Sequence, residues 1–171
     1  VGVDAATDLI ITAEQRKTMY HNVRQFRTTK PLFAVDFYND AKYVDGCIAG
    51  GRAYLHINAN GDLEPCAFLH YSDSNIRHDK ILDAMQKPLF KAFHDNEPFN
   101  KNMLRPCPLV DNPGMLPMMV KQSGAKSTDM SAPEDPMELS KKCVPLARDW
   151  EPVANELWQK EQEQEKVSKR G

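Results

Sequence analysis

Apolar positions recur with a helical period near the beginning of the chain. Three apolar side chains lie three or four residues apart, as the buried face of a helix requires: Met19, Val23 and Phe26. Thr12, followed by Gln15 three residues later, has the pattern of a capping box, in which each side chain binds the backbone amide of the other residue. The pattern predicts a helix over about 13 to 28.

A continuous apolar run follows this helix. Residues 31–37 read PLFAVDF, without the alternation of a strand that faces water on one side. Such a run is typical of a strand buried in a parallel sheet after a crossover helix. We therefore predict a buried strand here, as half of a unit of an α/β fold.

The pattern changes after residue 45 and predicts a hairpin. Three glycines among residues 46–51 permit backbone conformations closed to other residues, which predicts a tightly curved loop. Residues 52–57 then have strand-like side chains, residues 58–61 form a turn, and residues 62–66 return antiparallel. The predicted hairpin carries a cysteine near each end.

Two short helices are predicted after the hairpin, and a stiff loop after the helices. Residues 81–85 and 88–93 have helical apolar spacing, and the second segment opens with proline in its first turn. We expect both helices to cover one face of the hairpin. Prolines on both sides of Cys107 exclude regular helix and central strand over residues 104–113.

The last third of the chain divides into a polar segment and a helical one. Residues 122–136 are rich in Ser, Asp, Pro and Lys and predict a tether. From Pro136 an amphipathic helical region is expected, with interruptions at Pro145 and near Pro152. The polar tail 159–171 is expected to fray or to be disordered.

Composition narrows the classes of partner. The 171 residues include 12 prolines, and the mean hydropathy is -0.59, which favours one compact domain with irregular flanks. With 22 basic and 24 acidic side chains, the chain has no strong field to attract nucleic acid or anionic lipid. No stretch is long and apolar enough to cross a membrane, and no export signal is visible, so a cytoplasmic location is expected.

Three of the four cysteines lie in the segments that bend most. Eighteen residues separate Cys47 from Cys66, so a hairpin brings both sulfurs toward one centre, and the loop around Cys107 supplies a third thiol. Soft thiolates select zinc, copper(I) or iron-sulfur clusters, and the CxxC spacing of many structural zinc sites is absent. The residues alone leave three interpretations open: a cluster, a zinc site, or unrelated buried thiols.

Two strings resemble a known family. CIAGGRAYLHINANGDLEPC, residues 47–66, has thirteen residues from the first cysteine to Gly61 and four more before the second cysteine. It resembles the opening motif of the SPASM or twitch extension of radical S-adenosylmethionine (radical SAM) enzymes. LRPCPLVDNP, residues 104–113, is similar to the third cysteine loop of members with one cluster. The resemblance covers about residues 1 to 120.

The resemblance implies an α+β fold in three parts. Residues 1–44 would be the last helix and strand of a partial (β/α) barrel, residues 45–121 a SPASM or twitch domain, and residues 122–171 a tether and helical tail. One auxiliary [4Fe-4S] cluster would be held by three ligands: Cys47, Cys66 and Cys107. Three polar residues at the end of the strand would face substrate or cofactor: Asp36, Asn39 and Asp40.

The fourth cluster ligand stays open at this stage. Cys143 would complete a set of four thiolates, although it lies beyond the predicted tether, where a buried structural cysteine is common. Asp111, four residues after Cys107, could supply an oxygen instead. An exchangeable site that binds substrate is the third alternative.

The sequence also departs from the family pattern. The CxxxCxxC motif, which holds the cluster that cleaves S-adenosylmethionine, does not occur, and neither does the second cysteine set of full SPASM domains. The chain would therefore be part of an enzyme that modifies a peptide or small molecule, with S-adenosylmethionine and a second cluster bound only by the full-length enzyme. A truncated barrel edge would invite a homodimer. The rival interpretations are a zinc-stapled interaction module and a metal-free docking domain.

Overall fold

The computed structural model of the protein describes residues 9–168, and its first helix, α1 (Ala13–Thr29), begins where the sequence predicts. The Gln15 amide donates to Thr12 Oγ1 at 3.2 Å, and the Thr12 amide donates to Gln15 Oε1 at 2.8 Å. The predicted capping box is thus confirmed. The first eight residues of the predicted barrel segment lie outside the described part of the chain.

Residues 31–37 do not form the predicted buried strand. They run as an irregular connection to a short 3-10 helix, η2 (Ala41–Tyr43), and the side chain of Phe33 is 93% exposed. Leu32 and Phe37 are also exposed. A strand needs a neighbour to accept and donate its backbone hydrogen bonds, and none pairs with this run within residues 9–168. The prediction of a buried strand was therefore wrong.

The predicted hairpin is confirmed, although its paired part is short. β1 (His56–Ile57) pairs antiparallel with β2 (Leu63–Glu64), and His56 lies opposite Glu64. A second antiparallel pair joins β3 (Tyr71–Ser72) to β4 (Lys126–Ser127). Strand β4 falls within the predicted tether, so that segment contributes to a sheet.

Three short helices follow the hairpin. α2 (Ile81–Ala84) and α3 (Pro88–Asn96) confirm the two predicted helices. Their side chains Ala84 and Phe90 pack with Leu63 of the hairpin, so they cover it as expected. α4 (Met115–Ser123) was not predicted and ends at Gly124, which takes the left-handed backbone conformation common at helix ends.

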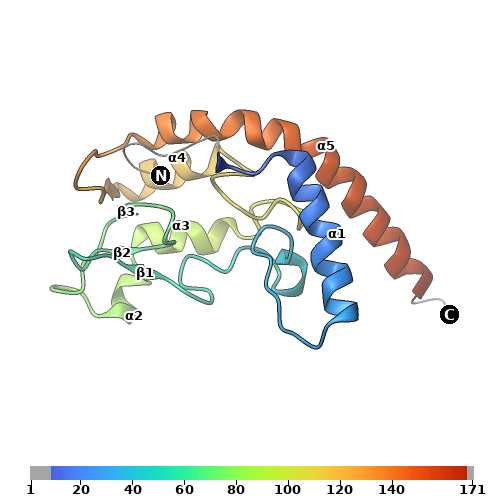
Figure 1. The fold of residues 1–171 in the computed structure, drawn as a ribbon. Helices are drawn as coiled ribbons and strands as arrows, with labels where there is room; N and C mark the ends of the chain where they lie inside the picture. The colour runs from blue at the N-terminus through green and yellow to red at the C-terminus, as the bar shows by residue number, and fades with distance from the viewer. Residues whose placement is uncertain (1–8, 169–171) are drawn as a thin grey trace.

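The C-terminal region is a single helix. α5 (Pro136–Ser168) continues through Pro145 and Pro152, so the predicted interruptions were wrong. The tail from residue 159 is also helical as far as residue 168, and residues 169–171 lie outside the described part. Figure 1 shows α5 bending between a part that lies over α4 and a part that runs alongside α1. Proline inside a helix removes a hydrogen bond and bends the axis, which accounts for this shape.

Besides the cluster of Leu63, Ala84 and Phe90, two larger hydrophobic clusters hold the described elements together. The larger one joins α3, α4 and the first half of α5 to the segment around β3. The smaller one joins Tyr20 of α1 to Trp150 and Leu157 of α5. Helices with two short antiparallel sheets confirm the α+β class. Within residues 9–168, no helix is both long and apolar enough to cross a membrane.

Candidate metal centre

Cys47 lies in a loop that curves back on itself. Gly50 has a φ of +69° and donates its amide to the Pro65 carbonyl at 2.9 Å, which brings the loop against the residue before Cys66. A Cβ at Gly50 would stand 2.7 Å from Phe93 Cβ of α3, so only glycine fits there. Arg52 donates to the carbonyls of Asp45 (2.8 Å) and Cys47 (3.2 Å). The loop that carries Cys47 is therefore fixed from both sides.

Cys66 lies at the end of the hairpin, against a tyrosine. Tyr54 Oη is 2.7 Å from Cys66 Sγ. Two residues earlier, the fully buried Glu64 is hydrogen-bonded to His56 Nδ1 at 2.7 Å and accepts from Asn58 Nδ2 at 3.0 Å. His56 thus has a structural partner within the hairpin.

Cys107 lies in the proline-rich loop, which Asp111 closes. Asp111 Oδ2 accepts the Cys107 amide at 3.0 Å, and the Cys107 carbonyl accepts the Asn112 amide at 3.1 Å. The Val110 amide points at Cys107 Sγ from 3.4 Å. The sulfur therefore lies inside a tight turn of backbone amides, in the irregular conformation that the prolines predict.

Arg16, which the sequence did not single out, anchors this loop from α1. Its Nη1 is 2.6 Å from Asp111 Oδ1, and its Nη2 donates to the carbonyls of Tyr38 (2.7 Å) and Leu104 (2.8 Å). Arg16 and Asp111 are 3% and 1% exposed, so the pair is buried. A lone arginine in an amphipathic helix gives no sequence signal for such a role.

The three polar residues expected to face substrate form hydrogen bonds within the protein instead. Asn39 Nδ2 donates to Asp36 Oδ2 at 2.7 Å, and Arg27 donates to both oxygens of Asp40 at 2.8 and 2.5 Å. Burial opposes ionisation of Asp40, but the hydrogen bonds from Arg27 hold its pKa below the usual value. These side chains fix the connection after α1.

The cysteines share one neighbourhood. Cys47, Cys66 and Cys107 are partly buried and pack against the larger hydrophobic cluster, of which Cys143 is a member. All four are free thiols. Burial raises the pKa of Cys47 to about 11 and also raises that of Cys107, with the charge of Asp111 adding to the latter. These two thiols are thus protonated near neutral pH, and binding a metal would release their protons.

Glu97 lies beside this neighbourhood, near the amide of Cys47. Both of its carboxylate oxygens are buried without a donor at full hydrogen-bonding geometry, and Arg52 Nη1 forms a long ion pair with Oε2 at 3.9 Å. A Cβ at Gly46 would stand 2.5 Å from that same oxygen, which places the carboxylate against the residue before Cys47. Burial raises the pKa of Glu97 to about 7. Nothing in the sequence distinguishes this glutamate from the others.

No single-ion site is formed. Across residues 9–168, no three His, Cys, Asp or Glu side chains meet as the ligands of one metal ion would. A cluster distributes its ligands over several irons, so its thiolates need not converge on one point.

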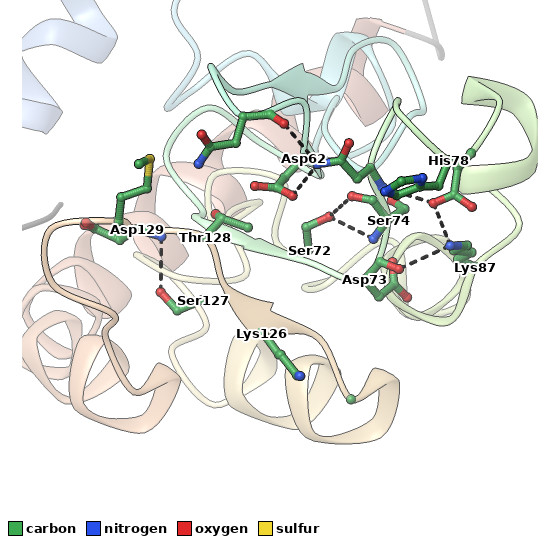
Figure 2. Close-up of a pocket in the computed structure, with 15 residues that line it drawn as sticks. Asp62, Ser72, Asp73, Ser74, His78, Lys87, Lys126, Ser127, Thr128 and Asp129 are labelled. Atoms are coloured by element: carbon green, nitrogen blue, oxygen red, sulfur yellow. Dashed lines mark hydrogen bonds and ion pairs between the residues drawn. The ribbon is translucent and has the colours of Figure 1, made fainter.

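A polar cleft of about 730 Å³ lies elsewhere, between β3–β4 and the segment before α3 (Figure 2). No cysteine lines it. Some of its acidic side chains are hydrogen-bonded inside the protein: Asp79 accepts from Lys87 at 2.7 Å, and Asp62 accepts from Asn75 at 2.8 Å. The cleft is separate from the cysteine neighbourhood.

Comparison with known proteins identifies the cysteine segment. The family model of the SPASM iron-sulfur cluster-binding domain matches residues 47–108. The chain carries a SPASM-type domain. The match begins at Cys47 and includes Cys66 and Cys107, whereas Asp111 and Cys143 lie outside it. No curated protein and no solved structure matches the chain.

The residues of this SPASM domain fit an iron-sulfur cluster. SPASM domains bind such clusters, and this one offers three thiols at one hydrophobic cluster, the donor type that iron-sulfur sites use. A buried carboxylate whose ion pair with Arg52 spans 3.9 Å lies beside the first of them. The assignment of Cys47, Cys66 and Cys107 as ligands stays a prediction, as does the fourth ligand.

Proposed function

We propose that this chain is the auxiliary-cluster region of a cytoplasmic radical SAM enzyme that modifies a peptide or small-molecule substrate. In this proposal Cys47, Cys66 and Cys107 hold one [4Fe-4S] cluster. The observation that carries it is the SPASM match, which spans the segment bounded by the first and third of these cysteines. Because CxxxCxxC is absent, the chain would not cleave S-adenosylmethionine by itself.

When bound, the cluster would supply an electron donor or acceptor, or a Lewis-acidic iron that orients substrate. The protein around it supplies fixed geometry. Hydrogen bonds hold the backbone at Gly50, next to the Cys47 loop, and at Cys107. The hydroxyl beside Cys66 and the amide beside Cys107 are hydrogen-bond partners for thiolate sulfurs, and such partners tune a cluster's potential.

Cysteine variants test this proposal. Cys47→Ser, Cys66→Ser and Cys107→Ser should each abolish incorporation of iron and sulfide during anaerobic reconstitution, because each removes a thiolate from the cluster. Cys143→Ser serves as the matched control, since Cys143 is buried in the same hydrophobic cluster but lies outside the SPASM match. It should retain most of the iron.

Three results would contradict the proposal. Retention of iron and sulfide by the three SPASM variants would exclude these thiols as ligands. Binding of zinc without sulfide would make the domain a zinc-stapled module. If the wild type and the cysteine variants all fold and none of them binds metal, the domain would be a metal-free docking domain.

A further inference from the structure

Glu97 is an unusual residue in this fold because its buried charge is weakly partnered. Its side chain is 10% exposed, its ion pair with Arg52 spans 3.9 Å, and neither carboxylate oxygen has a donor at full hydrogen-bonding geometry, although the Cys47 amide lies close enough to lower its pKa. A buried carboxylate normally has two or more donors around it, since loss of hydration is costly. Burial of a weakly paired carboxylate destabilises the fold, and departures of this kind from good packing are expected at functional sites.

The Glu97 carboxylate lies next to Cys47, the first predicted cluster ligand. Oε2 lies against Gly46, close enough that a Cβ there would stand 2.5 Å away. Glu97 begins the connection from α3 to the Cys107 loop, since α3 ends at Asn96. Along the chain it therefore lies between Cys66 and Cys107, and in space its carboxylate lies against the residue before Cys47.

The other candidates for a fourth ligand are otherwise engaged. Asp111 binds Arg16 with Oδ1 and the Cys107 amide with Oδ2. Ligation through Asp111 would break a buried ion pair or open the loop that holds Cys107. Cys143 is 6% exposed in α5, where it packs as part of the hydrophobic cluster. Glu97 would give up less than Asp111, because its ion pair with Arg52 spans 3.9 Å and its oxygens have no donor at full hydrogen-bonding geometry.

We propose that Glu97 is the fourth ligand of the auxiliary cluster, binding one iron through a carboxylate oxygen. This inference rests on the proposed function, because it presupposes a cluster at Cys47, Cys66 and Cys107. Iron bound by oxygen at one corner differs from iron bound by thiolate, since the carboxylate is the harder ligand. That iron would be the first one lost on oxidation.

The test compares four proteins after anaerobic reconstitution: the wild type, Glu97→Gln, Glu97→Cys and the control Asp95→Asn. Asp95 is two residues away with a side chain 75% exposed, so its neutralisation should change nothing. The readouts are iron and sulfide per chain and the electron paramagnetic resonance spectrum after mild oxidation.

The expected result is a loss of one iron. The wild type and Asp95→Asn should hold about four irons, while Glu97→Gln should hold about three and give the spectrum of a three-iron cluster. Glu97→Cys should restore about four irons with a spectrum altered by the new thiolate. The metal-free Glu97→Gln protein should melt at the same temperature as the wild type or higher, because the substitution removes a buried charge and gives up only a long ion pair with Arg52.

Several outcomes separate this inference from the proposed function. A wild type that binds no iron and sulfide overturns both. If the wild type binds the cluster and Glu97→Gln has the same iron content and spectrum, the ligand assignment alone is overturned. It is also overturned if Cys143→Ser loses one iron and Glu97→Gln does not. Should Glu97→Gln fail to fold, Glu97→Cys decides: a changed four-iron spectrum supports the assignment, and the wild-type spectrum contradicts it.

Discussion

At the scale of single residues, hydrogen bonds to sulfur are where the protein can tune a cluster most directly. Tyr54 Oη lies 2.7 Å from Cys66 Sγ. Burial and the hydrogen bond to Cys66 raise the pKa of Tyr54, so its hydroxyl keeps its proton and can donate to the sulfur. A donor to a thiolate ligand stabilises the reduced, more negative state of a cluster.

Replacing Tyr54 with phenylalanine should therefore lower the reduction potential of the cluster. A hydrogen bond worth roughly 1 kcal/mol corresponds to on the order of 40 mV for one electron. A potentiometric titration monitored by electron paramagnetic resonance measures this shift. Tyr43→Phe, at a tyrosine 62% exposed on the surface, should show no shift. Equal potentials in the wild type and Tyr54→Phe would mean that the hydroxyl does not act on the sulfur.

The buried pair of Arg16 and Asp111 makes a prediction about stability. Asp111→Ala removes the carboxylate and leaves the guanidinium buried without its anion, which should lower the free energy of unfolding by about 3 to 5 kcal/mol. Urea unfolding of the metal-free protein measures the change. Asp149→Ala breaks the exposed pair with Arg148 and should change the free energy by less than about 0.5 kcal/mol. Similar effects of the two substitutions would contradict the role of Asp111 as an anchor.

At the scale of elements, one carboxylate near the end of α5 ties that helix to α1 and η2. Glu161 Oε1 accepts from Tyr20 Oη at 2.5 Å and from Arg24 Nη2 at 2.6 Å, and Lys42 Nζ lies 2.8 Å from Oε2. Burial opposes ionisation of Glu161, but Lys42, Tyr20 and Arg24 outweigh it and lower its pKa from 4.5.

This contact should make the stability of the fold depend on pH. Because the pKa of Glu161 is lower in the folded chain than in the unfolded one, its stabilisation is complete above about pH 4.5 and is lost as the pH falls below that value. Glu161→Gln should lower the free energy of unfolding by about 2 kcal/mol at pH 7. The difference from the wild type, measured by urea unfolding, should shrink toward pH 3. A difference that is constant with pH would contradict this account.

Local patterns predicted the elements that local chemistry decides. The capping box of α1, the turn of the hairpin and the proline that opens α3 were all visible in the sequence. The helical region from Pro136 was also predicted, but its continuity was not, because Pro145 and Pro152 each predict an interruption from local sequence alone. Its buried side chains nevertheless recur every three or four residues across both prolines, so packing stabilises a continuous helix. Those residues are Leu139, Cys143, Ala147, Trp150, Ala154 and Leu157.

Long-range contacts were the part that the sequence could not predict. β4 exists because Ser127 and Lys126 find partners in β3, more than fifty residues earlier. The ion pair of Arg16 with Asp111 joins residues 95 positions apart. Motif spacing singled out the three thiols as predicted ligands, whereas Glu97 and Tyr54 could be singled out only from their neighbours in space.

At the scale of the whole molecule, several strongly exposed apolar side chains follow one another along a single connection. Leu32, Phe33 and Phe37 are 64%, 93% and 74% exposed in the run after α1. Contiguous apolar surface of this kind usually packs against further protein. We propose that this surface meets another copy of this chain.

Isolated protein should therefore self-associate into a dimer. Sedimentation velocity over a concentration series should show mass above that of the monomer, and the double variant Phe33→Asp and Phe37→Asp should remain monomeric. Leu82→Asp is the matched control, because Leu82 is similarly exposed at 76% but lies on α2, away from this run. A monomeric wild type, or a dimer that the double variant leaves intact, would contradict the prediction.

The metal content of the intact chain tests the central claim most directly. Anaerobic purification should be followed by iron, sulfide and zinc analysis and a visible absorption spectrum of the same sample. The account predicts about four irons and four sulfides per chain, with a broad brown absorption band. A colourless protein that holds zinc without sulfide would contradict it.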